Sequence, residues 1–247
     1  MRNAAITVVS AIALALGPGA PVASQGNAIT PANLASRGLV IRSDTMDGYV
    51  GDPLRGQTFG RYVYAVARTT LAGRAVDLIT VNYTSSGNEK LFQSDTLAVD
   101  AATLAPIWYR FHAKYDAASI TFHGRHATGY AVREHQARVK VDFTLSEDGF
   151  DSGVARPMLS SLPLEAGYRT SFKSFNMWKN TEETISLAVA GSEVLEVSGR
   201  KVDCWVVSGP PRGANSSAAR RWVAKASGQV MRSTEPSSDQ TFWMVGR

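Results

Sequence analysis

Apolar and polar residues alternate strictly along several segments of the chain. Ile107, Tyr109 and Phe111 face one way while Trp108 and Arg110 face the other, because successive side chains of a strand point to opposite sides of a sheet. Residues 139–145 and 184–189 repeat this pattern. Several strands therefore have one buried face and one wetter face, which is typical of an antiparallel sheet.

Weaker strand patterns fill most of the remaining chain. The segments are 59–69, 74–84, 91–99, 118–123, 127–134, 168–176, 194–198, 202–208, 220–226, 229–233 and 241–245. Glycine lies between many of these segments, and it supplies the positive φ of tight hairpin turns at no steric cost. The order of strands and turns predicts a meander of hairpins.

One segment interrupts the strand pattern. The apolar residues of 151–162 fall near helical spacing and Pro163 prevents continuation, so we predict a short helix there. So many consecutive strands do not form a flat open sheet. Curling around a core buries the apolar face and reduces the exposure of the strand edges. The predicted fold is all-β and mainly antiparallel, a curved meander sheet or incomplete β-barrel with one short helix.

The first 24 residues predict an export signal. Arg2 precedes the apolar run 4–16 and the small-residue segment 17–24, an arrangement typical of a secretory signal peptide. We expect cleavage at about Ser24/Gln25, a linker over 25–38 and a single β-sheet domain over 39–247. No second apolar run of spanning length follows, so we expect a mature chain without a transmembrane span, soluble in the periplasm or outside the cell.

Composition narrows the class of protein further. An apolar fraction of 44% with 19% charged residues fits a chain that buries a core, so wholesale disorder is not expected. The single cysteine, Cys204, excludes an intrachain disulfide framework. The net charge of +5 includes no block of like charges, so we expect no nucleic-acid partner.

The sharpest local constellation is HGRH at residues 123–126. A two-residue turn with glycine first would make His123 and His126 cross-strand partners on one face, with Arg110 and His112 on the neighbouring strand. Three interpretations stay open: solvated or packed histidines, a pH-responsive anion site, and a transition-metal site. A metal usually needs a third ligand, and the sequence places no carboxylate to supply one. We therefore expect no metal.

Common catalytic and cofactor motifs are missing from the chain. There is no Gly-x-Ser-x-Gly elbow, His-Glu-x-x-His, Cys-x-x-Cys, Walker loop or dinucleotide glycine fingerprint. The neighbouring Glu182 and Glu183 would point to opposite faces of a strand, which disfavours shared acid–base work. Cys204 lies in a predicted strand, where we interpret it as a small buried hydrophobe. We expect no cofactor and assign no catalytic residue.

The order of features resembles a family of exported bacterial proteins known only as a domain of unknown function. The matching pieces are residues 95–100 with 103–106, then 158–167, and a terminal hairpin with Trp222, Ser227-Gly228, Val230 and Arg232. Together they cover about 40–245. The resemblance implies an export address and a long curved antiparallel sheet, similar to the half-barrels of lipoprotein carriers. It implies no catalytic residues.

The predicted function is binding without catalysis. A curved sheet with many aromatic residues leaves an apolar concave face, where a lipid-like ligand or an envelope protein would bind. The residues proposed for binding are Trp108, Arg110, His112, His123 and His126. Two alternatives stay open: an exported hydrolase whose site is assembled from distant loops, and a structural or assembly protein of the cell envelope that pairs through a sheet edge.

Overall fold

The computed structural model describes residues 28–30, 34, 38–51, 56–86, 88–177, 179–211, 218–236 and 241–246. The predicted signal peptide over 1–24 lies outside the described residues, as does most of the predicted linker over 25–38. Within that linker, Ile29 and Leu34 are described and are buried in the main core. The Ile29 amide also donates to the carbonyl oxygen of Ser171 at 2.7 Å.

The described residues form one 15-stranded sheet. The strands are β1 (Arg42–Val50), β2 (Gln57–Leu71), β3 (Arg74–Ser85), β4 (Asn88–Asp100), β5 (Pro106–Ala113), β6 (Ala117–His123), β7 (His126–Val132), β8 (Val139–Thr144), β9 (Phe150–Asp151), β10 (Arg169–Asn176), β11 (Thr181–Val197), β12 (Arg200–Pro211), β13 (Ala218–Ala224), β14 (Val230–Pro236) and β15 (Thr241–Gly246). Each strand pairs antiparallel with its neighbours, except that β9 runs parallel to β10. The predicted antiparallel meander is confirmed.

The first and last described strands pair in the middle of the sheet. Its order is β8-β7-β6-β5-β4-β3-β2-β1-β15-β14-β13-β12-β11-β10-β9. The first described strand therefore pairs with the last, with Met46 opposite Gly246 and Val50 opposite Phe242. This single ladder joins an N-terminal half, β1–β8, to a C-terminal half, β9–β15.

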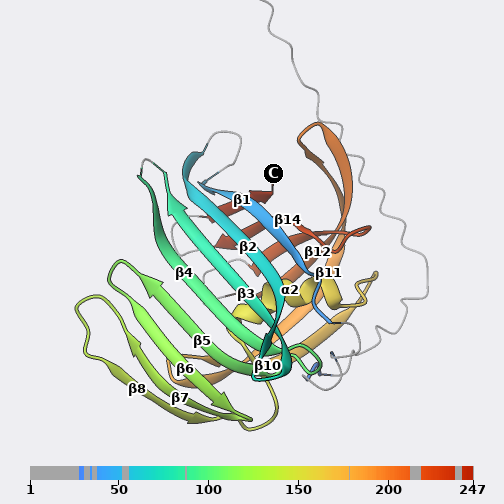
Figure 1. The fold of residues 1–247 in the computed structure, drawn as a ribbon. Helices are drawn as coiled ribbons and strands as arrows, with labels where there is room; N and C mark the ends of the chain where they lie inside the picture. The colour runs from blue at the N-terminus through green and yellow to red at the C-terminus, as the bar shows by residue number, and fades with distance from the viewer. Residues whose placement is uncertain are drawn as a thin grey trace, which may run out of the picture.

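The sheet curves around a short helical segment (Figure 1). This segment consists of η1 (Ser152–Val154), α2 (Ala155–Met158) and η2 (Leu159–Ser161), which confirms the predicted short helix. Pro157 lies inside it and has no amide proton to donate, and Leu162 is already extended. We call the side of the sheet that faces α2 the concave face and the opposite side the outer face.

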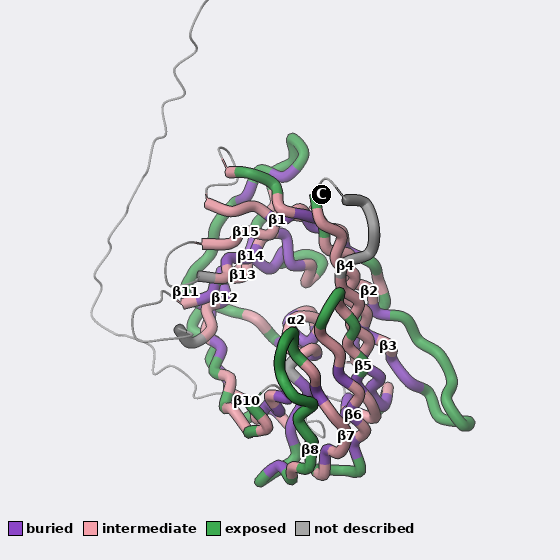
Figure 2. Tube along the Cα trace, turned by 90° about the vertical axis from the view of Figure 1, so that its left-hand side faces the viewer, coloured by how far each residue is buried: buried purple, intermediate pink, exposed green. Residues whose placement is uncertain are grey.

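The main hydrophobic core lies between the concave face and the helical segment. Figure 2 shows buried positions along the strands that surround α2. Val154, Met158 and Leu159 contribute from the helical segment and are at most 1% exposed. Near the edges of the sheet, the Phe143 ring on β8 lies 5.7 Å from the Phe175 ring on β10. Side chains therefore bring the two edges together without a backbone ladder, and the sheet remains an open, incomplete barrel.

A second, smaller core lies on the outer face of the C-terminal half. It contains Leu195, Cys204, Val206, Trp222 and Met231, among others. The neighbouring residues Val207 and Val223 belong to the main core, as the alternation of strand side chains requires. Cys204 is fully buried here, as predicted. No helix among the described residues has the length and apolar character needed to cross a membrane.

Candidate functional site

Five aromatic rings gather on the concave face where β1, β2, β3 and β15 lie side by side. Phe59, Tyr62, Tyr64, Tyr83 and Phe242 form this set, which we call the aromatic cluster. The Tyr62 ring stacks on Tyr83 at 4.7 Å, and Phe59 lies 5.7 Å from Phe242. Each of the five residues is only partly buried. The cluster therefore presents a partly exposed apolar surface inside the curve of the sheet.

Two glycines make room for these rings. A Cβ atom at Gly48 would lie 2.5 Å from Cζ of Phe59, and one at Gly60 would overlap the Tyr83 ring. The Tyr83 hydroxyl then donates to the carbonyl oxygen of Phe59 at 3.0 Å. Because any larger residue at Gly48 or Gly60 would displace a ring, the sequence fixes the shape of the cluster at these positions.

A cavity of about 220 Å³ adjoins the aromatic cluster. It is lined by Ile79, Val81, Gln93, Asp95, Leu97, Tyr109, Phe111, Gly153 and Met177. Gln93 pairs across β3–β4 with Tyr83 of the aromatic cluster, so the two surfaces are continuous on one face. We call this space the acid cavity, because Asp95 is its one titratable carboxylate.

Asp95 lines the acid cavity, and Asp151 lies near enough for the two charges to interact. Burial raises the pKa of Asp95 to about 6, although Gln93 and the Tyr109 hydroxyl donate to its carboxylate. Burial raises the pKa of Asp151 to about 7, and the Asp95 charge adds to this effect. Asp151 Oδ1 accepts from the Gly153 amide at 2.8 Å, whereas Oδ2 has no hydrogen-bond partner among the described residues. Neither aspartate forms an ion pair with a described residue.

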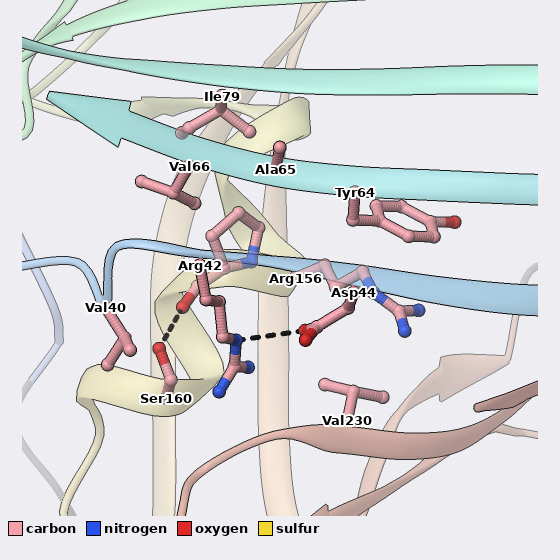
Figure 3. A pocket seen from close by; sticks show the side chains of 11 residues that line it. Val40, Arg42, Asp44, Tyr64, Ala65, Val66, Ile79, Arg156, Ser160 and Val230 are labelled. Carbon is pink, nitrogen blue, oxygen red and sulfur yellow. Dashed lines mark hydrogen bonds and ion pairs between the residues drawn. The ribbon is translucent and has the colours of Figure 1, made fainter. Parts of the chain in front are cut away.

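A second, nearly filled cavity of about 20 Å³ lies beside α2 (Figure 3). Ile79 lines both cavities. Arg42 Nε pairs with Asp44 Oδ2 at 2.9 Å, and Gln229 Nε2 donates to Asp44 Oδ1 at 2.9 Å. Ser160 Oγ donates to the carbonyl oxygen of Pro157 at 2.7 Å. This volume holds about one water molecule, so a ligand would enter only if side chains moved.

Arg156 extends from α2 into the concave side beside this second cavity. Its guanidinium carbon lies 4.1 Å from the centre of the Tyr64 ring, and Nη1 is 3.5 Å from Ser233 Oγ. Nη2 also contacts Met46 Sδ. Burial lowers the pKa of Arg156, while the nearby acids Asp44 and Glu235 act in the opposite direction. The side chain stays partly exposed.

The residues predicted for binding all lie on the outer face. Trp108, Arg110 and His112 alternate with Tyr109, which belongs to the main core. The Arg110 guanidinium lies 5.3 Å from the Trp108 ring centre, and its Nη1 donates to the carbonyl oxygens of Tyr109 and Ile120. Arg110 and His112 line an open depression of about 430 Å³. The binding role of these residues stays a prediction, and they lie on the opposite face from the aromatic cluster.

The histidine pair forms as predicted at the β6–β7 turn. His123 lies opposite His126, and Gly124 has φ of +60°. His126 Nε2 lies 2.9 Å from Asp142 Oδ1 on β8, a carboxylate that the local sequence did not place beside it. Lys140 also pairs with Asp142, and together with His126 it holds the pKa of that carboxyl below its usual value. In the described part of the chain, no group of three or more His, Cys, Asp or Glu residues is arranged to hold a metal.

Sequence reasoning missed Asp95, Asp151 and Arg156 as site residues. The sequence contains a signal for Asp95. It lies two residues before Leu97 and four before Val99, a spacing that places all three on the same face of a strand. A lone carboxylate on a buried face is a candidate for a perturbed pKa. Asp151 and Arg156 belong to the helical segment, and no local pattern shows which part of the sheet they meet.

Comparison with known proteins agrees with this architecture. No curated protein matches the chain. The fold is similar to that of a beta-barrel-like protein of the domain of unknown function DUF1849 from Brucella abortus, with a TM-score of 0.53 and 11% identity over 85% of this chain and 96% of that one. At this identity the likeness shows the fold alone. Residues 45–239 match the family described as Protein of unknown function (DUF3108), and the chain therefore belongs to the DUF3108 family.

Proposed function

We propose that this protein is exported and that its concave face binds an apolar, lipid-like small molecule. The observation that carries the proposal is the aromatic cluster, which is partly exposed on the concave face and continuous with the acid cavity. Concave, mostly apolar surfaces with a few polar groups are typical of small-molecule sites. The polar groups here are Gln93, Asp95 and the tyrosine hydroxyls.

Physical chemistry supports an apolar occupant for this surface. Five neighbouring rings that keep part of their area in water leave burial energy unused, at about 25 cal/mol per Å² of apolar surface. A ligand that covers them recovers this energy. Aromatic side chains also lose little rotamer freedom on binding, since each has only two side-chain torsions.

The export part of the proposal rests on the apolar leader in residues 1–24. The precursor would be cleaved at about Ser24/Gln25 and act in the periplasm or outside the cell. Expression of the precursor in an exporting host, followed by mass measurement of the purified chain, tests this. A measured mass equal to that of a chain starting at Gln25 supports export, and an uncleaved chain retained in the cytoplasm contradicts it.

Binding is tested with the processed protein and a neutral fluorescent naphthylamine dye, which brightens in apolar surroundings. We expect saturable binding that lipids displace. Tyr62→Ala removes the central ring of the aromatic cluster and should weaken dye binding about tenfold or more. Tyr115→Ala is the matched control, because Tyr115 is an exposed tyrosine beyond β5.

Two outcomes would contradict this function. One is the lack of saturable dye binding by a protein with a cooperative unfolding transition. The other is an equal effect of Tyr62→Ala and Tyr115→Ala. Native mass measurement adds an independent check, since a copurifying lipid-sized mass supports the proposal. A clean apoprotein that binds no dye favours an envelope-protein partner instead.

A hydrolase is the second candidate, and the acid cavity is the observation that favours it. A carboxyl group with a raised pKa beside a cavity is suited to general acid catalysis. Asp95→Asn separates the two functions. Loss of turnover on a panel of ester and glycoside substrates with dye binding unchanged would support catalysis, whereas no turnover by the wild-type protein would reject it.

A further inference from the structure

Three arginines and two acids share the polar part of the concave side. Arg42, Arg156 and Arg221 supply the positive charges, and Asp44 and Glu235 the negative ones. Arg42 pairs with Asp44 at 2.9 Å, and Arg221 Nη2 pairs with Glu235 Oε1 at 2.7 Å. Both acids therefore have an arginine of their own.

Arg156 is the remaining cation of this group. Its contacts with described residues are the Tyr64 ring, the Ser233 hydroxyl at 3.5 Å and the Met46 sulfur. None of the described carboxylates forms an ion pair with it. A guanidinium has five N–H donors in a planar fork that fits two oxygens of a carboxylate or phosphate. A neutral hydroxyl and a thioether use little of this capacity.

The Arg156 guanidinium also lies at the border of the aromatic cluster. It packs on Tyr64, whose ring is 6.0 Å from that of Tyr62. A cation at the rim of an apolar surface matches a molecule with an acidic head and an apolar tail. Because these surroundings screen charges less than water does, a bound anion would interact strongly with Arg156.

We infer that the ligand of the concave face is a lipid with an anionic head group, which Arg156 binds while the tail covers the aromatic cluster. This inference rests on the proposed function. The added points are that the head group of the ligand is anionic and that Arg156 binds it. A single-tailed lipid fits better than a two-tailed one, since the acid cavity beside the aromatic cluster measures about 220 Å³. The space beside Arg156 measures about 20 Å³, so the head group enters it only when side chains move.

The test compares two probes that share a tail and differ in charge. Hexadecanoate and hexadecanol are each titrated against the neutral naphthylamine dye bound to the processed protein. The wild-type protein should bind hexadecanoate about tenfold or more tightly than the alcohol. Arg156→Gln and Arg156→Met should remove this preference and leave the affinity for hexadecanol unchanged.

The two Arg156 variants cover different risks of misfolding. Glutamine keeps polar contact with Ser233, while methionine packs against Met46 and Tyr64 without leaving an unpaired donor. Arg156→Lys should keep part of the preference, because it keeps the charge without the planar fork. Arg200→Gln is the control, since it removes an exposed arginine at the start of β12.

The outcomes separate this inference from the proposed function. Equal affinity of the wild-type protein for both probes overturns the inference and leaves the function standing. An equal loss of both probes in every Arg156 variant also overturns it, because a purely structural role would act on both. Failure of both probes to displace the dye contradicts the function as well.

Discussion

At the scale of single residues, the buried acids Asp95 and Asp151 make the protein sensitive to pH. Burial raises their pKa values to about 6 and about 7, from the 3.8 of an unperturbed aspartate. The folded chain therefore holds these protons more tightly than the unfolded chain. The stability that they contribute is fully present below about pH 4 and is lost as the pH rises through 6 and 7.

Asp151→Asn should remove most of this pH dependence. The amide resembles the protonated acid and still accepts from the Gly153 amide, so it avoids the cost of a buried charge. We expect the variant to match wild type near pH 4 and to exceed it at pH 8 by on the order of 2 kcal/mol in the free energy of unfolding. Urea unfolding between pH 4 and 8 measures this. If the free energy of unfolding depends on pH equally in wild type and variant, Asp151 does not titrate in this range. Asp148→Asn, at an exposed position in the preceding turn, is the control.

Cys204 should be unreactive in the folded protein. It is fully buried in the second core, and burial raises the pKa of its thiol to about 11. Since the thiolate is the reactive form, we expect no labelling by a maleimide until the chain is unfolded in urea. Rapid labelling of the folded chain would mean that the second core opens readily.

At the scale of elements, the β6–β7 hairpin depends on one glycine. Gly129 has φ of +149°, and a Cβ atom there would overlap the carbonyl oxygen of Ser119 on β6. The backbone of Gly129 thus lies closer to the next strand than any side chain allows. Glycine usually lowers the stability of a strand, but at this position the close approach of the two backbones requires it.

Gly129→Ala should therefore destabilise the protein by about 2 kcal/mol or more, because β6 and β7 would have to separate. Gly191→Ala is the matched control. Gly191 lies at the irregularity between β11 and β12, and a Cβ atom there meets nothing within 4 Å. The free energy of unfolding of the Gly191→Ala variant should stay within about 0.5 kcal/mol of the wild-type value. Equal melting temperatures for the two variants would contradict this account.

At the scale of the whole molecule, β15 joins the two halves of the sheet. It pairs with β1 on one side and β14 on the other. Without it, β1 and β14 become open edges with unpaired backbone groups, which favour aggregation. The concave site also spans this junction, since Phe242 lies on β15 while Phe59 lies on β2.

A chain that ends at residue 240 should lose cooperative folding. Thermal unfolding followed by circular dichroism should show a broad transition in place of a single steep one, with association visible in light scattering. Deletion of Arg247 alone is the control, because it leaves β15 complete. A truncated chain that unfolds as steeply as wild type would show that the two halves fold together without their central ladder.

The sequence by itself determined which residues form strands and which face each presents. Side-chain alternation is local, with a period of two residues, so it separated Tyr109 from Arg110 without knowledge of any distant contact. Turn chemistry is also local, and the pairing of His123 with His126 followed from Gly124. The short helical segment and the buried state of Cys204 were predicted for the same reason.

Only the tertiary structure decided which distant segments meet. The ladder between β1 and β15 joins residues about two hundred positions apart. No local pattern specifies such a pair, because its formation depends on closing the whole sheet. The same holds for Asp95 with Asp151 and for Arg156 with Tyr64. The sequence determined the faces of the strands, whereas the curvature of the complete sheet around α2 determined which of their side chains form the concave site.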